Sequence, residues 1–305
     1  YMSIPRGKPL SFSRQDLTIE SVGFARNELS SEDSTGNGFE IVVRDLGPRE
    51  VRRLRESLPA VREYGLPNYF DEQRFGNLKH KQGWIALDLA RGNYEDGLKR
   101  LLTAVSDFDP RREKSFKSGL YRHWGDWKTC RDIAGRFGQH HSIFEHLHKN
   151  HGDFAGAFRF VSSRVRLIHL FAFQSHLWNR AVAMHLEGAV DACKRFAVHI
   201  REGRLVFPRE EVPVRPEWNH AFMLTGAALE GVDDPRQRAL YEKVLRHWKL
   251  GPDEFRIDGV PGFALKAEPR AHLCEFLHFA LRVEALLHLR LLVVEDDEVA
   301  AAHVE

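Results

Sequence analysis

The chain has 305 residues, of which 43% are hydrophobic and 29% are charged. This composition is typical of a folded globular protein and excludes general disorder. The 45 Lys and Arg residues nearly balance the 43 Asp and Glu residues, so the net charge is only +2. Because no global basic field would attract nucleic acid, any such binding must use local patches. No apolar run is long enough to span a membrane, and no membrane association is predicted.

The three cysteines, Cys130, Cys193 and Cys274, lie far apart and form no CxxC pair. This usage predicts a reducing, cytoplasmic setting without a structural zinc site or a disulfide framework. The length is sufficient for a large core and favours two domains.

Two stretches in the first part of the chain alternate apolar and polar residues, as half-buried β-strands do. They are residues 17–24 and 39–44, and the polar turn between them predicts that they pair in an antiparallel manner. Residues 49–62 then place apolar side chains three and four positions apart, which predicts an amphipathic helix. Its other face carries Arg49, Arg52, Arg53 and Arg55. That face is interpreted either as a solvated helix surface or as a surface that contacts phosphates.

The middle of the chain is predicted to be mainly helical. Apolar periodicity favours helices over residues 82–91, 97–108, 121–137, 162–187 and 234–249, with a charged loop at 109–114 and a short strand at 204–207. A strand is predicted again at residues 286–294. Strands at both ends and helices between them indicate an α+β protein in which one domain is inserted into another.

Residues 65–76 have glycine at both ends and combine aromatic, amide, carboxylate and guanidinium side chains. Pro67 and the flanking glycines argue against a helix, and the segment lacks the alternation of a core strand. A surface turn that leads into an edge strand is one interpretation. The other is a binding site for a flat, polar ligand, because loops contain both turns and sites.

Five histidines gather between residues 140 and 151, namely His140, His141, His146, His148 and His151. They lack the HExxH frame and any paired cysteines, so a solvated helix end is expected and no metal site is predicted. The chain contains no GxSxG, GxxxxGK[ST] or GxGxxG motif. No cysteine stands in a context that would activate it as a nucleophile.

The string Asn68-Tyr69-Phe70-Asp71-Glu72-Gln73-Arg74-Phe75-Gly76 resembles the NYFGxQRFG signature of the TruD family of tRNA pseudouridine synthases. Three further elements of this family have similar segments here, in the expected order. Residues 36–44 resemble its GNxFxxxxR element, residues 172–179 its AxQSxLxN helix, and residues 224–226 a short glycine loop of its inserted domain.

The resemblance implies a pseudouridine synthase catalytic core with a mixed, largely antiparallel sheet, interrupted by a mainly helical TRUD domain. On this basis residues 1–76 and 266–305 are expected to belong to the core, and residues 77–265 to the inserted domain. The implied activity is isomerisation of a D-arm uridine of tRNA, at position 13 in tRNA numbering, to pseudouridine. It implies tRNA as the partner and no metal or organic cofactor; no protein partner is predicted.

The resemblance also assigns roles to individual side chains. Asn68 and Phe70 are expected to line the uridine pocket, with the amide binding polar edges and the ring packing on the base. Gln73 and Arg74 are expected to hold the loop or a phosphate. Asn37 and Phe39 would support the site from a neighbouring strand. For Tyr69 and Phe75, packing in the core is considered at least as probable a role as contact with the substrate.

Three departures from the family pattern bear on activity. The motif that carries the catalytic aspartate is not present, and the nucleophile is expected upstream of Tyr1. Asp71 stands where the family has glycine. It is not expected to act as a substitute for the missing nucleophile. The closing family motif is not recognisable after residue 294. Two alternatives to an active synthase therefore remain open: a truncated or degenerate relative that binds structured RNA without catalysis, and a globular protein without an RNA role.

Overall fold

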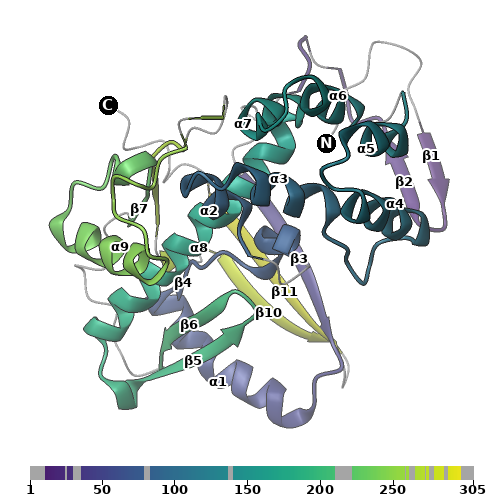
Figure 1. Ribbon diagram of the computed structural model, residues 1–305. Helices are drawn as coiled ribbons and strands as arrows, with labels where there is room; N and C mark the ends of the chain where they lie inside the picture. Colours follow the sequence, from purple (N-terminus) through teal and green to yellow (C-terminus); the bar gives the residue numbers. More distant parts are fainter. Residues whose placement is uncertain are drawn as a thin grey trace. The chain divides into compact units, whose positions relative to one another are not determined.

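A computed structural model describes residues 11–24, 26–29, 36–78, 83–136, 140–209, 222–257, 259–260, 265–271, 273–274, 278–284 and 288–296 (Figure 1). Its contacts divide the chain into two compact units. Tyr1–Glu63 and Glu275–Glu305 form the first unit, and Tyr64–Cys274 form the second. The fold is α+β, as the sequence predicts. The expected domain boundaries at residues 76 and 265 stay a prediction, although the contacts place the 65–76 segment with the helical unit.

The described residues of the first unit form a three-stranded antiparallel sheet, a hairpin and one helix. In the sheet, β11 (His288–Asp296) lies between β10 (His278–Glu284) and β3 (Gly36–Arg44). The hairpin joins β1 (Ser11–Arg14) to β2 (Leu17–Glu20). Helix α1 (Pro48–Tyr64) is the helix predicted over residues 49–62.

The predicted pairing of residues 17–24 with residues 39–44 is wrong. Strand β2 ends at Glu20 and pairs with β1 across a tight two-residue turn, with Leu17 opposite Arg14. Strand β3 instead pairs over its full length with β11, which places Val43 opposite Leu289. Both β3 and β11 are nine residues long, so this pairing forms more backbone hydrogen bonds than a pairing with the four-residue β2 could provide.

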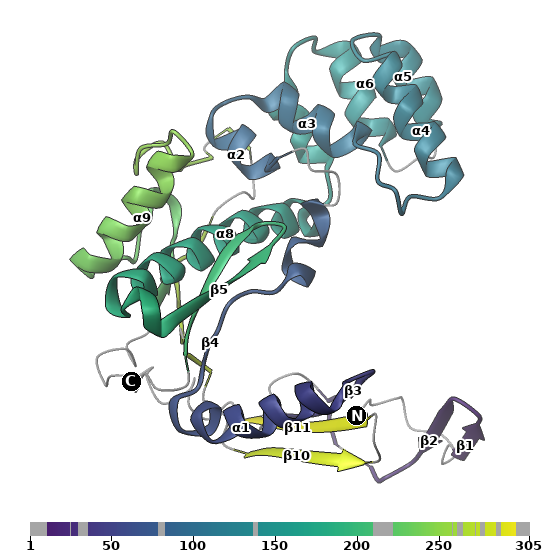
Figure 2. The same ribbon diagram turned by 90° about the horizontal axis from the view of Figure 1, so that it is seen from below.

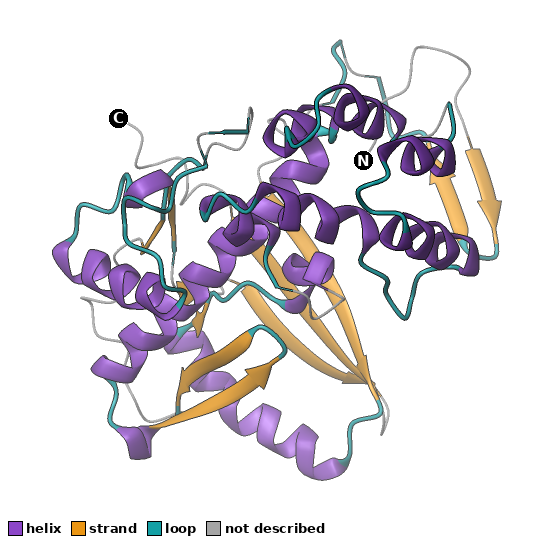
Figure 3. Cartoon of the chain, in the orientation of Figure 1, coloured by secondary structure: helices purple, strands orange, loops and turns teal. Residues whose placement is uncertain are grey.

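The second unit is built around eight helices and three short two-stranded pairs in its described residues (Figure 3). The helices are α2 (Ile85–Ala90), α3 (Tyr94–Thr103), α4 (Arg111–Arg122), α5 (Trp127–Ala134), α6 (His141–Lys149), α7 (Phe154–Ala157), α8 (Ser163–Ala189) and α9 (Pro235–His247). The strand pairs are β4 (Leu66–Pro67) with β9 (Leu273–Cys274), β5 (Arg195–Ile200) with β6 (Gly203–Pro208), and β7 (Phe222–Leu224) with β8 (Glu268–Arg270).

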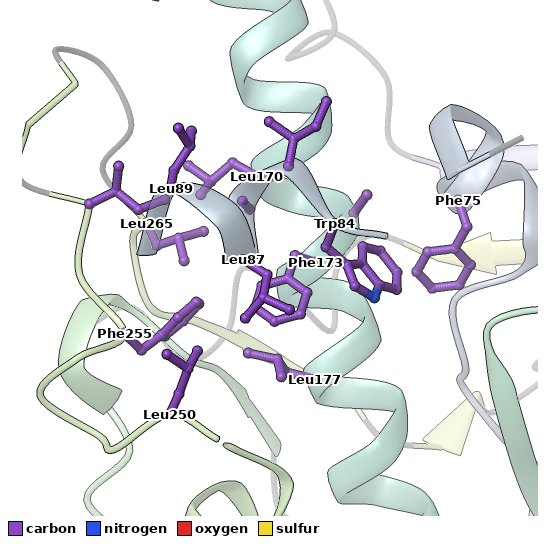
Figure 4. Close-up of a cluster of buried hydrophobic side chains, with 14 of the residues drawn as sticks. Phe75, Trp84, Leu87, Leu89, Leu170, Phe173, Leu177, Leu250, Phe255 and Leu265 are labelled. Atoms are coloured by element: carbon purple, nitrogen blue, oxygen red, sulfur yellow. The ribbon is translucent and has the colours of Figure 1, made fainter. Parts of the chain in front are cut away.

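Helix α8 is the central element of this unit. It begins after Ser162, whose Oγ caps the helix by accepting a hydrogen bond from the N–H of Val165. Apolar residues lie on several of its faces, which is expected of a helix surrounded by other elements. Its Leu170, Phe173 and Leu177 pack in a cluster of large apolar side chains that also includes residues of α2 and of the chain after α9 (Figure 4).

Helices α4, α5 and α6 pack in succession at one end of the second unit (Figure 2). Two predictions here are wrong. Residues 109–114 are not all loop, because α4 already begins at Arg111. Residues 121–137 are not one helix, because α4 ends at Arg122 and α5 begins at Trp127. Between them Gly125 has a φ of +101°, a conformation that interrupts a helix and that glycine adopts readily.

Candidate functional site

Two side chains of α8 hold the 65–76 segment. The amide of Asn179 accepts a hydrogen bond from the Phe70 N–H at 2.9 Å and donates one to the Phe70 carbonyl oxygen at 2.8 Å. One turn earlier, the Oγ of Ser175 accepts a hydrogen bond from Arg74 Nε at 3.1 Å. Residues four apart lie on the same face of a helix, so this face of α8 fixes the backbone around Phe70.

The side chain of Asn68 is held by residues near the C-terminal end of the second unit. Its Nδ2 donates to the carbonyl oxygen of Ala271 at 3.0 Å. The guanidinium of Arg270 donates from Nη2 to Asn68 Oδ1 at 2.7 Å and to the Asn68 carbonyl oxygen at 3.0 Å. A charged donor strengthens such bonds, so Arg270 determines both the position and the orientation of the Asn68 amide.

Phe70 is half-buried and has cationic groups near its ring. Arg270 Cζ lies 3.9 Å from the ring centroid and Arg74 Cζ lies 5.0 Å from it. The Phe70 ring also meets Trp178 edge to face, with the centroids 5.6 Å apart. These distances fit cation–π and aromatic contacts. The segment and Arg270 together combine an amide, an aromatic ring and two guanidinium groups, which can bind a base edge, a base face and phosphate oxygens.

Sequence reasoning missed Arg270 as a member of this group. It is 202 positions from Asn68 along the chain, and the residues around it, Glu268 to Ala271, match no motif. The pairing of β4 with β9, which joins Leu66 to Cys274, brings this part of the chain back to the 65–76 segment.

The buried amide of Gln174 links two of the segments that the resemblance identified. Its Nε2 donates to the carbonyl oxygens of Thr225 at 2.9 Å and of Lys266 at 3.0 Å. The indole N–H of Trp178 similarly donates to the Phe222 carbonyl oxygen at 3.0 Å. Buried carbonyl groups need such partners, so the polar residues of α8 tie β7 and the chain around β8 to the helix.

Tyr69 and Phe75 belong to the packing of this unit. Phe75 is 2% exposed and meets Trp84 edge to face at 6.0 Å between centroids (Figure 4). The hydroxyl of Tyr69 donates to the Val206 carbonyl oxygen at 2.9 Å and accepts from the Val206 N–H at 3.2 Å. Burial is the main cause that raises the pKa of Tyr69 well above its usual value, so this phenol stays protonated and holds β6.

Comparison with known proteins identifies the family. A family model described as tRNA pseudouridine synthase D (TruD) matches residues 1–290. The chain belongs to the TruD family. Its relatives include "Probable tRNA pseudouridine synthase D 2" of Methanocaldococcus jannaschii, 33% identical over 216 residues, which are 68% of this chain and 49% of that protein. "Probable tRNA pseudouridine synthase D 1" of Methanococcus maripaludis is 30% identical over 212 residues, 68% of this chain and 54% of that protein.

The fold agrees with this assignment. The crystal structure of a TruD protein from Methanosarcina mazei matches with a TM-score of 0.62 and 19% identity, over 93% of this chain and 71% of that one. This chain spans about half the length of the first relatives that it matches.

The other residues that the TruD resemblance singled out have different surroundings. Gln73 is exposed. Asp71 is also exposed, and its Oδ1 accepts a hydrogen bond from the neighbouring Glu72 N–H. Asn37 and Phe39 lie on β3 in the first unit, where they are in register with Glu295 and Val293 of β11. The roles expected for these residues in substrate binding stay predictions.

The histidines of residues 140–151 lie at the start of α6, within it and after it. His146 Nε2 is 2.8 Å from Asp153 Oδ2, and the ring of His140 stacks on Phe116. Within the described ranges, no group of three or more His, Cys, Asp or Glu side chains is arranged to hold a metal ion. None of the helices described has the length and apolar character needed to cross a membrane.

Proposed function

We propose that the protein to which this chain belongs isomerises a uridine of tRNA to pseudouridine, at D-arm position 13. The observation that carries the proposal is the placement of Arg74 and Arg270 over the Phe70 ring, with Arg270 also bonded to Asn68, on a backbone held by α8. Family membership and the names of the relatives support it. A tRNA substrate and a cytoplasmic setting are part of the proposal.

The proposed reaction detaches the uracil from its ribose, rotates it and rejoins it through carbon. Because substrate and product are isomers, the reaction needs no oxidant, reductant or second substrate. The base must leave its stack to be reached, and a flipped base requires a polar edge contact and an aromatic surface. In this proposal the Asn68 amide binds the uracil edge, Phe70 packs on the base, and Arg74 binds a neighbouring phosphate.

The experiment measures tritium release from tRNA labelled at uridine C5, with the whole protein as the enzyme. Phe70→Ala should reduce the rate strongly, whereas Phe196→Ala, which removes an exposed aromatic side chain from β5 in the same unit, should not. Sequencing the product for pseudouridine at position 13 tests the site. Tritium release accompanied by pseudouridine at a position other than 13 would refute the D-arm assignment.

Catalysis also depends on a nucleophilic aspartate, and its location upstream of Tyr1 stays a prediction that the gene sequence tests directly. A whole protein that binds tRNA tightly but releases no tritium would refute the proposed catalysis. That outcome would instead identify the alternative, a relative that binds structured RNA without modifying it.

A further inference from the structure

Phe108 lies in the turn between α3 and α4 and is 82% exposed, more than any other aromatic side chain among the described residues. A single exposed apolar residue is common on protein surfaces and by itself indicates nothing. Phe108 differs because its backbone is rigidly held and because two exposed arginines, Arg111 and Arg112, follow it in the chain after the flanking Asp107 and Asp109.

The turn that carries Phe108 is fixed by local hydrogen bonds. The Ser106 N–H donates to Asp109 Oδ2 at 2.8 Å, and the Phe108 N–H donates to Ser106 Oγ at 3.2 Å. Lysines of α4 anchor the turn from the other side, since Lys114 Nζ donates to the Asp107 carbonyl oxygen and Lys117 Nζ pairs with Asp109, at 2.8 Å and 2.9 Å. A preorganised backbone loses little entropy when a ligand binds to its side chain.

Arg111 and Arg112, both exposed, follow in the first turn of α4. Cations are unfavourable there, because the N-terminal end of a helix is the positive end of its dipole. The only acidic residue of that turn, Glu113, pairs with Lys117 at 3.5 Å. Among the residues that the structure describes, no carboxylate lies within ion-pairing distance of Arg111 or Arg112. Within this part of the chain the two guanidinium groups are therefore available to an anion.

Pro110, the residue that precedes α4, provides no side-chain cap for the helix. The first N–H groups of a helix have no partner within it and make this end of α4 the positive end of its dipole. An exposed aromatic ring followed in the chain by two exposed guanidinium groups suits a ligand that is both planar and anionic.

We propose that Phe108, Arg111 and Arg112, the α4 patch, bind RNA: an unpaired base stacks on Phe108 and its flanking phosphates contact the two arginines. The inference rests on the proposed function and extends it, because it assigns a second contact with the tRNA at a distance in sequence from the 65–76 segment. Guanidinium groups match phosphate geometry, and aromatic rings stack on any base that is not paired. A protein interface or a membrane would require a larger apolar area than one ring among charges provides.

The first test measures the affinity of the 305-residue chain for a tRNA transcript by fluorescence anisotropy at several salt concentrations. Phe108→Ala should weaken binding about 5-fold to 150-fold and leave the salt dependence unchanged, because stacking involves no released counterion. Phe108→Trp should preserve the affinity. The double variant R111Q/R112Q should reduce the slope of log K against log[salt] by about 1.4–1.8, the value for two phosphate contacts.

The matched control is K243Q/R246Q, which removes the same charge from the exposed surface of α9 in the same unit. If it changes the salt slope as much as R111Q/R112Q does, the effect is one of net charge and the α4 patch is refuted. A blunt RNA duplex offers no unpaired base, so its binding should be insensitive to Phe108→Ala. Equal losses for duplex and tRNA would also refute the stacking contact.

Further outcomes separate the α4 patch from the proposed catalysis. If the chain does not bind tRNA, or if Phe108→Ala binds it like the unaltered chain, the α4 patch is refuted whatever the tritium assay shows. If the variants lose affinity as expected while the whole protein releases no tritium, the α4 patch stands and the proposed catalysis fails. Sedimentation that shows dimers dissociated by Phe108→Ala, with tRNA affinity unchanged, would assign the surface to a second copy of the chain instead.

Discussion

The hydrogen bonds between Asn179 and Phe70 lead to the sharpest prediction. Asn179 is 3% exposed, and its amide satisfies both the N–H and the carbonyl oxygen of Phe70. Asn179→Ala removes both partners and leaves two backbone groups unpaired. Each unpaired buried group costs about 1–3 kcal/mol. Because Phe70 is only half-buried and water can reach part of it, we expect the lower part of the combined range, a loss of about 2–4 kcal/mol in unfolding free energy.

The assay can isolate the unit concerned. All six tryptophans lie within Tyr64–Cys274, so the tryptophan fluorescence of a urea titration reports the unfolding of this unit alone. Hydrogen exchange at the Phe70 amide provides a local measurement, because the variant should lose protection there.

Asn150→Ala is the matched control, since Asn150 is exposed and the bonds of its side chain among the described residues are local ones to His146. We expect that substitution to change the unfolding free energy by about 0.5 kcal/mol or less, as is usual for surface positions. If Asn179→Ala had an equally small effect and the Phe70 amide kept its protection, the conclusion that α8 fixes this segment would be refuted.

The remaining predictions concern packing, charge and pH. Tyr69→Phe removes both bonds to the Val206 backbone and should cost about 1–3 kcal/mol in the same urea titration; an unchanged midpoint would mean that water replaces the hydroxyl. Arg270→Met removes two charge-assisted bonds to Asn68 and should lower both stability and tritium release, and Arg270→Lys should not restore them fully because lysine lacks the planar fork. Burial lowers the pKa of His176 from 6.5 to about 3, so the unfolded chain takes up this proton first as the pH falls. The contribution of neutral His176 to the unfolding free energy is complete above pH 6.5. It decreases by about 1.4 kcal/mol per pH unit as the pH falls toward 3. His176→Leu should make the urea midpoint depend less on pH between pH 6.5 and 5. An unchanged slope of the midpoint against pH would contradict the lowered pKa of His176.

The sequence predicts the elements of this fold better than their partners. Alternation identifies β3, and apolar periodicity identifies α8 almost to its ends. The pairing of β3 with β11 was not predictable, because alternation reports that one face is buried and not which strand lies alongside. Helix α4 was missed because its first turn is so rich in charge that it has the composition of a loop. Its buried Leu120 and half-buried Phe116, four residues apart, are the helical signal.

The candidate site was predicted only in part, for a similar reason. The motif string around Asn68 and Phe70 is local and can be recognised in the sequence. Its contacts are not local, since Asn179 is 109 positions from Phe70 and Arg270 is 202 positions from Asn68. No periodicity or spacing encodes a hydrogen bond over such separations. Only the packed unit reveals which polar groups fix the segment.

These contacts also change how the family signature is interpreted. Gln174, Ser175 and Asn179 are polar, buried residues of one helix, and each bonds to another part of the unit. Their presence in the signature is therefore explained by the need to satisfy buried polar groups. Asn68, Phe70 and Arg74, which are less buried, are the side chains proposed to meet the substrate, and their geometry depends on that frame and on Arg270. Substitutions in α8 should consequently impair RNA binding and stability together, whereas substitutions in the α4 patch should impair RNA binding alone.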